Sequence, residues 1–426
     1  MTNRHYILVM VTLVFVVNYL DRQILGILLP LIQKEFRVSD TQLGILTGPA
    51  FALIYASLGM PFAVIADRAN RRNIIALSLA IFSAMTVVCN FVTGFWQLVA
   101  ARAVVGIGEA GTGPSINSII ADLYPPQQRA SALAFYSAGL NVGLLIAFFG
   151  GGIIAGTFGW RAAFLASGIP GLILVFLFLF TVPEPPRGHS EALIDTGGAP
   201  GFMATVRYLW GQRSFRFLSL GTSMSAFSGY AGLAFVPSFL ARTHHLTPTQ
   251  IGLLLAITTG VFGYIGTLLS GVIADRVGKK DIRRTMLVPV VATLIGLPFA
   301  PFFYLSSSLT VVIASLAVPA FLGASYLGPA YAATQGLVPL RMRATAAAVL
   351  LFILNIVGLS FGPLWVGVVS DALKPSLGPD SLRWALLSNV VFTAAGALLY
   401  WLSSRTLDRD MARVSGEISQ SATQPT

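Results

Sequence analysis

Long apolar stretches dominate the pattern of hydrophobic and polar positions along the chain, and charged residues gather in the segments between them. A bilayer core of ~30 Å needs ~20 residues of α-helix, so each stretch is long enough to span a membrane. The pattern predicts twelve transmembrane helices, over residues 6–31, 43–66, 73–94, 96–121, 130–158, 160–182, 217–240, 251–274, 285–306, 309–337, 344–369 and 384–403.

One segment, 183–216, interrupts the pattern, because it contains Pro183, Pro185, Pro186 and the Gly197–Gly201 stretch. It divides the chain into a first bundle over 1–182, a linker over 183–216, a second bundle over 217–403 and a tail over 404–426. Within the linker, Phe202–Arg213 predicts a helix at the membrane interface. The first apolar run is too long for a signal peptide and lacks a cleavage site, so it predicts a retained span.

Composition supports a membrane protein, since 55% of the 426 residues are hydrophobic and only 10% are charged, against about 25% charged in soluble domains. A net charge of +11 is compatible with nucleic acid binding. Whether the basic residues form a binding surface depends on their positions along the chain. Nineteen of the 27 Lys and Arg residues lie on the side of the termini and six on the other. The positive-inside rule therefore predicts cytoplasmic termini, and we expect no nucleic acid partner. A monomer in a bacterial plasma membrane fits this pattern.

Catalytic and cofactor chemistry has little basis in the sequence. The single cysteine, Cys89, cannot form an intramolecular disulfide, and His5, His189, His244 and His245 lie in loops or the tail. The chain has no glycine-rich phosphate loop that would bind ATP. We expect no enzyme, no metal and no cofactor, with protons as the coupling ion.

A repeated loop motif supports the division into halves. Ala66–Arg72 follows the second span, and a similar segment, Ala274–Lys280, follows the eighth, 208 positions later. Parallel repeats of this kind imply a substrate site between the halves near the midplane. The second copy, Gly271 to Lys280, together with Arg102, Gly106 and Gly108 of the fourth span, resembles the major facilitator superfamily. The resemblance implies an all-α membrane fold of twelve helices in two pseudo-symmetric six-helix halves, and a secondary transporter.

The loop motif also has a direct physical interpretation. Asp67 and Asp275 end helices beside arginines, where pairing with a neighbouring helix end would stabilise one conformation. We predict a conformational latch that comprises Asp67, Arg68, Arg71, Arg72, Asp275 and Arg276. A solvated loop charge is the alternative, and it suits Arg71 as well as any function.

Four charges, Asp21, Arg22, Arg102 and Glu109, fall well inside predicted spans, all in the first half. Each costs ~2.5–3.5 kcal/mol at the bilayer centre and needs a partner, water or a proton. The helical rise of ~1.5 Å per residue places Asp21 and Arg102 at similar depths, so they can pair, whereas Glu109 lies roughly 10 Å closer to the cytoplasm without an opposite partner at its depth. We predict that Glu109 and Asp21 each take up and release protons during the transport cycle, with Arg102 and Arg22 biasing the release. A static Asp21–Arg102 pair is the alternative.

The stretch Asn18–Arg22, with Arg102 and Glu109, resembles the Spinster group of the superfamily. The resemblance implies proton-coupled alternating access for an amphipathic lipid, a lysophospholipid or a sphingosine 1-phosphate-like molecule. Arg22, Arg102 and Asn18 would hold its headgroup, and the second half supplies aromatic and polar candidates: Phe227, Tyr230, Tyr326, Tyr331 and Asn355. Two alternatives stay open, a carrier of small organic anions or drugs and a sensor that does not transport.

Overall fold

The computed structural model describes residues 3–186, 202–279, 281–339 and 342–423. Helices joined by short connections make up these residues, and no strand occurs among them. They form two compact units. Unit 1 comprises the described residues of Met1–Asp195, Gly232–Val261 and Pro363–Leu382, and unit 2 those of Thr196–Ala231, Phe262–Gly362 and Arg383–Thr426. Unit 1 contains residues from both halves of the sequence, whereas unit 2 contains residues from the linker, the second half and the tail, so the division into six-helix halves stays a prediction.

Unit 1 contains the helices of the first half and the ends of helices from the second. Its elements are α1 (Arg4–Phe36), α2 (Asp40–Thr47), α3 (Pro49–Arg68), α4 (Arg71–Val88), α5 (Phe95–Ala110), α6 (Thr112–Leu123), α7 (Pro126–Thr181), the end of α9 (Arg213–Thr243), α10 (Pro248–Leu255), most of the π-helical η1 (Ala256–Phe262), most of α17 (Phe361–Leu377) and η5 (Gly378–Asp380). Helix α7 contains two predicted spans, and Gly159, at φ 84°, separates them.

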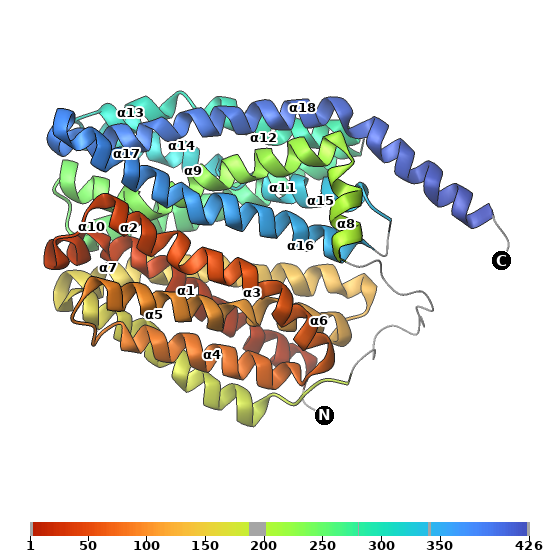
Figure 1. The fold of residues 1–426 in the computed structure, drawn as a ribbon, viewed down its shortest axis with the longest axis horizontal. Coiled ribbons are helices and arrows are strands. Elements are labelled where there is room, and N and C mark those ends of the chain that lie inside the picture. The colour runs from red at the N-terminus through yellow and green to blue at the C-terminus, as the bar shows by residue number, and fades with distance from the viewer. Residues whose placement is uncertain (1–2, 187–201, 280, 340–341, 424–426) are drawn as a thin grey trace. The chain divides into compact units, whose positions relative to one another are not determined.

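Unit 2 contains α8 (Phe202–Trp210), the first part of α9, α11 (Gly263–Gly278), η2 (Ile282–Met286), α12 (Leu287–Gly296), α13 (Phe299–Leu305), α14 (Leu309–Leu322), α15 (Leu327–Gly336), α16 (Arg343–Leu354), the π-helical η4 (Asn355–Ser360) and nearly all of α18 (Ser381–Thr423). Within each unit, Figure 1 shows elongated helices that run next to one another. The predicted span ends at residue 403, but helix α18 continues to Thr423 and so includes most of the predicted tail.

The helices account for the twelve predicted crossings. Eight helical stretches in the described part of the chain are long and apolar enough to cross a membrane. Two of them, Ser131–Thr181 with 51 residues and Thr345–Val414 with 70, are long enough for two crossings each. Arg283–Gly296 with Phe299–Leu305 adds a bent crossing. Helices α5 and α6, broken at Gly111, supply the remaining one.

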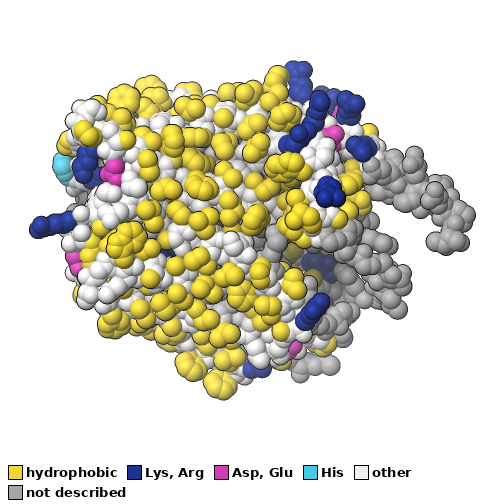
Figure 2. All heavy atoms as spheres, viewed as in Figure 1, with side chains coloured by type: hydrophobic (Ala, Val, Ile, Leu, Met, Phe, Trp, Pro, Cys, Tyr) yellow, Lys and Arg dark blue, Asp and Glu magenta, His cyan; other side chains and the backbone are white. Residues whose placement is uncertain are grey.

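The surface has the composition that a bilayer requires. Large apolar side chains are exposed on many helices, up to 84% for Phe180. In Figure 2 hydrophobic side chains cover much of the visible face, and the charged side chains gather toward the ends of the helices. Water would penalise so much exposed apolar area, whereas lipid does not. The chain is therefore an all-α membrane protein, as the sequence predicts.

A second marker of the internal repeat appears where α2 and α10 begin. Ser39 and Gln42 form a capping box at the start of α2, and Thr247 and Gln250 form one at the start of α10. In each box a hydroxyl and an amide satisfy backbone N–H groups that the first helical turn leaves free. The two boxes lie 208 positions apart, the same offset as the two loop motifs.

Two glycines allow α7 and α10 to cross closely inside unit 1. A Cβ atom added at Gly252 would lie 2.2 Å from the carbonyl oxygen of Phe148 and 3.0 Å from the Cα atom of Gly152. Both neighbours are backbone atoms, which cannot rotate away as a side chain would. Small residues at such crossings let helices approach each other in a membrane.

We therefore expect Gly252→Ala to destabilise the protein by about 1–3 kcal/mol, the usual range for overpacking. Thermal unfolding of the purified protein in detergent measures the effect. Gly59→Ala is the matched control, because a Cβ atom at Gly59 meets nothing within 4 Å and alanine favours helix. Equal melting temperatures for the two variants would show that the crossing tolerates the methyl group.

Candidate functional site

The four charges predicted inside the membrane lie together in unit 1. Asp21 and Arg22 are neighbours on α1, and Arg102 and Glu109 lie two turns apart on α5. Asp21, Arg102 and Glu109 are each only 1% exposed. Because successive helical positions differ by about 100°, Asp21 and Arg22 point to different partners.

Asp21 pairs with Arg102, as the depth argument predicts. An Nη1–H of Arg102 donates to Oδ2 of Asp21 at 2.8 Å, and the hydroxyl of Thr86 on α4 donates to Oδ1 at 2.5 Å. Both carboxylate oxygens are thereby satisfied. Charged groups in low dielectric need this pairing, because desolvation otherwise costs several kcal/mol per ion.

Glu109 has a partner that the sequence argument did not find. Arg22 donates through Nη2 to Oε2 of Glu109 at 2.5 Å and through Nε at 3.2 Å. The expectation that Glu109 lacks an opposite charge is therefore wrong. The arginine side chain is long enough to bridge the depth difference estimated from backbone positions alone.

Aromatic rings surround the Arg22 guanidinium. Its Cζ atom lies 5.2 Å from the ring centre of Tyr19, 5.0 Å from that of Phe51 and 4.6 Å from that of Tyr55. At these distances the ring faces attract a cation. The sequence analysis missed these three residues; the signal was the spacing, since Tyr19 lies three residues before Arg22 and Phe51 and Tyr55 lie four apart on one face of α3.

Two buried polar atoms of this charged cluster lack a hydrogen-bond partner among the described residues. They are Oε1 of Glu109 and Nε of Arg102. An unsatisfied buried acceptor and donor each carry a desolvation cost of roughly 1–3 kcal/mol. The cluster therefore has an oxygen that can take a proton and an N–H that can take an acceptor.

The helix is interrupted at Gly111, two residues after Glu109. Helix α5 ends at Ala110 and α6 begins at Thr112, whose hydroxyl donates to the carbonyl of Glu109 at 2.8 Å. A Cβ atom at Gly111 would lie 2.4 Å from Oγ of Ser78, so α4 passes too close for a side chain there. Glu109 thus lies in the last turn of α5, one turn before the start of α6.

The second-half candidates all lie in unit 2. Phe227 packs against Phe392 with ring centres 4.4 Å apart. Tyr326 and Tyr331 are half-buried against an apolar cluster that includes Leu337. The set is completed by half-buried Tyr230 on α9 and by Asn355, 9% exposed, which begins the π-helical turn η4.

Asn18, the remaining headgroup candidate, is a buried residue of α1. Asn18 lies one turn before Asp21 and Arg22 on α1 and is 3% exposed. It shares the interior of unit 1 with the charged cluster. Its role in binding stays a prediction.

Among the residues of the predicted latch, Arg71 is buried rather than solvated. Its guanidinium donates to Glu184 at 2.8 Å, to Ser118 at 2.9 Å, to the carbonyl of Pro185 at 3.0 Å and to Asp122. These bonds join the start of α4, the end of α6 and the segment after α7. The alternative of a solvated loop charge is wrong for Arg71, and the sequence analysis missed Asp122 and Glu184.

For the other predicted latch residues, the structure gives hydrogen bonds of Arg72 and exposed positions for three more. Arg72 donates its backbone N–H to Glu184 at 2.8 Å and a guanidinium N–H to the carbonyl of Leu179. Arg68, Asp275 and Arg276 are exposed. The side chain of Asp67 lies outside the described residues.

Just beyond the second loop copy, Arg283 binds Asp281 at 3.2 Å and Asp408 of α18 at 2.7 Å. Loss of solvent is the largest single effect on the Asp281 carboxyl and raises its pKa, whereas the hydrogen bonds from the backbone and guanidinium of Arg283 and the charges of Arg283 and Arg284 together lower the pKa more. The pKa therefore lies below its ordinary value, and Asp281 is ionised near neutral pH.

A third polar cluster in unit 1 joins residues from both halves of the sequence. Arg242 of α9 donates to the carboxylate of Asp40 at 2.5 and 2.9 Å and to Gln33 at 2.5 Å. Ser370 of α17 donates to Asp40 at 2.6 Å. We call this set, with Asp371, the Asp40 cluster.

Asp371 completes the Asp40 cluster from α17. Its carboxylate accepts the backbone N–H groups of Asp40 and Thr41, at 3.1 and 2.7 Å, at the start of α2. A carboxylate at a helix N-terminus satisfies free N–H groups and interacts favourably with the dipole. The sequence analysis named none of these residues, because each lies in a loop or at a span end, where charge is common.

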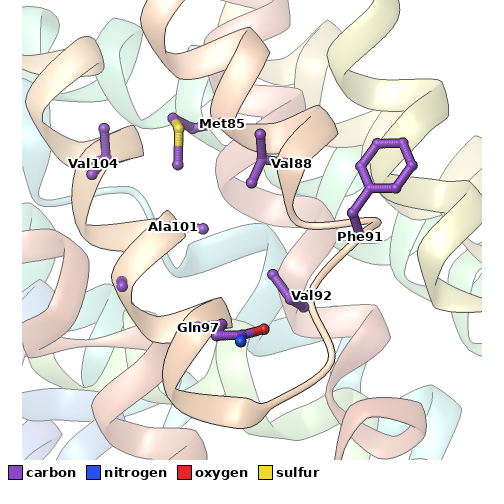
Figure 3. Close-up of a pocket in the computed structure, with 8 residues that line it drawn as sticks. Met85, Val88, Phe91, Val92, Gln97, Ala101 and Val104 are labelled. Carbon is purple, nitrogen blue, oxygen red and sulfur yellow. The ribbon is translucent and has the colours of Figure 1, made fainter.

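A shallow groove of about 400 Å³ lies between α4 and α5. In Figure 3 Met85 and Val88 line the α4 side and Ala101 and Val104 the α5 side. Gln97 is the one strongly polar side chain of its lining. No candidate residue lines the groove, so it is not the candidate site.

Comparison with known proteins identifies the family. The model of the Major Facilitator Superfamily matches residues 11–234 and 218–422. An MFS-type efflux pump of Mycolicibacterium smegmatis is 33% identical over 400 residues, which cover 94% of this chain and 92% of that protein.

Two further comparisons point to Spinster proteins. The sphingosine-1-phosphate transporter SPNS2 of Xenopus tropicalis is 29% identical over 393 residues, which cover 88% of this chain and 75% of that protein. A crystal structure of a bacterial homolog of the human lysosomal transporter Spinster, inward-facing and unoccupied, is 32% identical with a TM-score of 0.88, covering 96% of this chain and 98% of its own. The chain therefore belongs to the Major Facilitator Superfamily, as a membrane transporter rather than an enzyme, with Spinster proteins among its relatives.

Proposed function

We propose that this transporter carries an amphipathic single-chain lipid, a lysophospholipid or a sphingosine 1-phosphate-like molecule, by proton-coupled alternating access. The observation that supports the proposal best is the Arg22–Glu109 pair, 2.5 Å apart inside an aromatic enclosure, with Oε1 of Glu109 unpartnered among the described residues. The name of the SPNS2 relative supports the substrate class.

Competition for Arg22 gives a coupling mechanism. While Glu109 is ionised, it engages Nε and Nη2 of Arg22. A proton on Glu109 removes its negative charge, and the guanidinium then needs another anion, such as a phosphate, which it can bind through two hydrogen bonds. Proton binding to Glu109 and anion binding to Arg22 therefore favour each other, and this linkage is reciprocal. Asp21 would also take up and release a proton during the cycle, with Arg102, which stays protonated, as its counter-charge.

The alkyl tail requires apolar surface. We propose that Phe227, Tyr230, Tyr326 and Tyr331 line its path, with Asn355 as a polar group among them. Half-buried tyrosines suit this role, because each presents an apolar ring with a polar tip. For the latch we propose that Arg71, with Arg72, stabilises one access state, and that Asp67, Arg68, Asp275 and Arg276 contribute in another.

The setting that we propose is a bacterial plasma membrane, with the termini in the cytoplasm and the protein acting as a monomer. The excess of arginine and lysine on the side of the termini supports this orientation. Protons serve as the coupling ion without any other cofactor.

A carrier of small organic anions or drugs is the second candidate. The M. smegmatis relative, 33% identical, is named an efflux pump. An anionic drug would engage Arg22 through the same chemistry. The two candidates differ in whether a long alkyl chain contributes to binding.

Binding of radiolabelled lysophospholipid to the purified protein, in competition with sugars and drugs, tests the proposal. The double variant Arg22→Gln/Glu109→Gln removes both charges together, so that no unpaired charge is left buried. We expect it to bind roughly tenfold more weakly, since a hydrogen bond to a charged group contributes ~1.5–3 kcal/mol.

Exposed Arg37 provides the control, as Arg37→Gln. Selective lysolipid binding that survives the double substitution would overturn the headgroup assignment and keep the substrate class. Displacement by drugs but not by lysolipids would favour the second candidate.

A further inference from the structure

Five exposed arginines lie at one end of unit 2: Arg207 on α8, Arg213 and Arg216 at the start of α9, and Arg405 and Arg409 on α18. We call them the basic end surface. Figure 2 shows dark-blue side chains gathered around the region where Figure 1 places α8 and the later turns of α18.

Hydrogen bonds hold α9 and α18 together beneath this surface. The carboxylate of Asp410 accepts the backbone N–H of Ser214 at 2.8 Å, and the hydroxyl of Ser214 donates to Thr406 at 2.8 Å. Ser403 donates to the carbonyl of Ser214 at 3.1 Å. The opposite side of α8 and α18 is anchored in apolar packing, where Leu209 and Leu407 are fully buried. The arginine positions therefore lie on fixed backbone.

Nearby acids are already engaged. Asp408 pairs with Arg283, and Asp410 caps α9. Among the described residues, no carboxylate forms an ion pair with any arginine of the basic end surface. The surface thus keeps a positive charge that is complementary to an anion.

Exposed tryptophans place this surface at a membrane boundary. Trp210 ends α8 at 46% exposure, and Trp401 on α18 is 39% exposed. The Arg405 guanidinium lies 4.5 Å from the Trp401 ring centre. Tryptophan gathers at the level of lipid headgroups. At a rise of ~1.5 Å per residue, Arg405 lies ~6 Å and Arg409 ~12 Å beyond Trp401 along the helix. If Trp401 lies at the level of the lipid headgroups, both arginines lie within about one Debye length of those headgroups.

We propose that the basic end surface binds the headgroups of anionic phospholipids in the leaflet on the side of the termini. Each basic residue near an anionic leaflet strengthens association roughly fivefold. Short amphipathic helices with exposed apolar and basic residues, as in α8 with Met203, Trp210 and Arg207, bind this interface. The basic end surface shares no residue with the proposed substrate site, so each assignment stands or fails alone.

Binding of short-chain phosphatidylglycerol to the purified full-length protein in neutral detergent tests the proposal. Arg207→Gln/Arg213→Gln/Arg216→Gln is compared with Lys34→Gln/Arg37→Gln/Lys374→Gln, which removes the same charge from exposed positions in unit 1. We expect the first triple variant to bind at least about tenfold more weakly and the control to bind like the parent protein. A second variant, Arg405→Gln/Arg409→Gln, tests the α18 side if the triple variant unfolds.

The probes separate the sources of the anion. Phosphatidylcholine and inorganic phosphate should each bind far more weakly than phosphatidylglycerol. Equal binding of phosphatidylglycerol and phosphatidylcholine would overturn the role of charge. Inorganic phosphate as strong as the lipid, or an equal loss in the unit 1 control, would overturn a lipid site at this surface.

Discussion

Glu109→Gln protein in liposomes is expected to lose uptake driven by a pH gradient. Glutamine keeps the size of the side chain but can neither release nor take up a proton. With one proton per cycle, a gradient of one pH unit supports about tenfold accumulation, and this accumulation should fall to the level that the substrate gradient alone supports. Uptake of labelled lysolipid with and without an imposed pH gradient measures it.

Exchange of labelled for unlabelled substrate without a gradient should continue in the same variant, because it does not require net proton movement. Glu35→Gln is the matched control, since Glu35 pairs with Arg161 in a largely exposed position, with its side chain 42% exposed. Full pH-driven uptake by Glu109→Gln would remove Glu109 from the coupling mechanism.

Arg102→Leu should produce the largest loss of stability. It removes the counter-charge of Asp21, which is 1% exposed, and leaves the hydroxyl of Thr86 as a hydrogen-bond donor to its carboxyl group. Breaking a buried pair in this way costs about 3–5 kcal/mol. The double variant Asp21→Asn/Arg102→Leu should regain much of this loss, because no buried charge remains. Thermal unfolding in detergent measures both.

Arg283→Leu is the comparison, because its partners are half-exposed and such pairs contribute about 0–1 kcal/mol. If the single and double variants are equally destabilised, the loss comes from packing and not from the unpaired charge. Transport by the double variant addresses the remaining alternative. Normal pH-driven uptake in that protein would identify Asp21–Arg102 as a static pair.

Helix number and depth follow from the sequence because both depend on local quantities. The length of an apolar run fixes whether it spans, and the rise per residue fixes how deep Asp21 and Arg102 lie. Their pairing was therefore predictable. The Arg22–Glu109 pair was not, since the estimate compared backbone depths and left out the reach of a long side chain.

Partners that come from other helices depend on how those helices are rotated. Thr86, Phe51 and Tyr55 face the charges because close contacts set the helix orientations; a Cβ atom at Gly108, for example, would lie 2.7 Å from the backbone nitrogen of Phe82. Single-sequence periodicity does not contain this information. The same reason hides Asp122 and Glu184, which reach Arg71 only after α6 and α7 have packed.

The tail illustrates a different limit. Residues 404–426 are more polar than the predicted spans, and the sequence therefore predicts a tail that follows the last span. In the structure the last helix continues into this tail as far as Thr423. Leu407 and Met411, one turn apart, pack into the core of unit 2 and stabilise its start. An amphipathic period after the last span was the available signal.

The Asp40 cluster has a consequence for how the polypeptide is held together. Asp40 and Thr41, from the first half of the sequence, bind Arg242, Ser370 and Asp371 from the second, within one compact unit. The covalent connection through the linker is thus not what joins the halves at that end. Two separately synthesised fragments, divided in the linker, would still carry these complementary groups, so we expect the two fragments to associate through them.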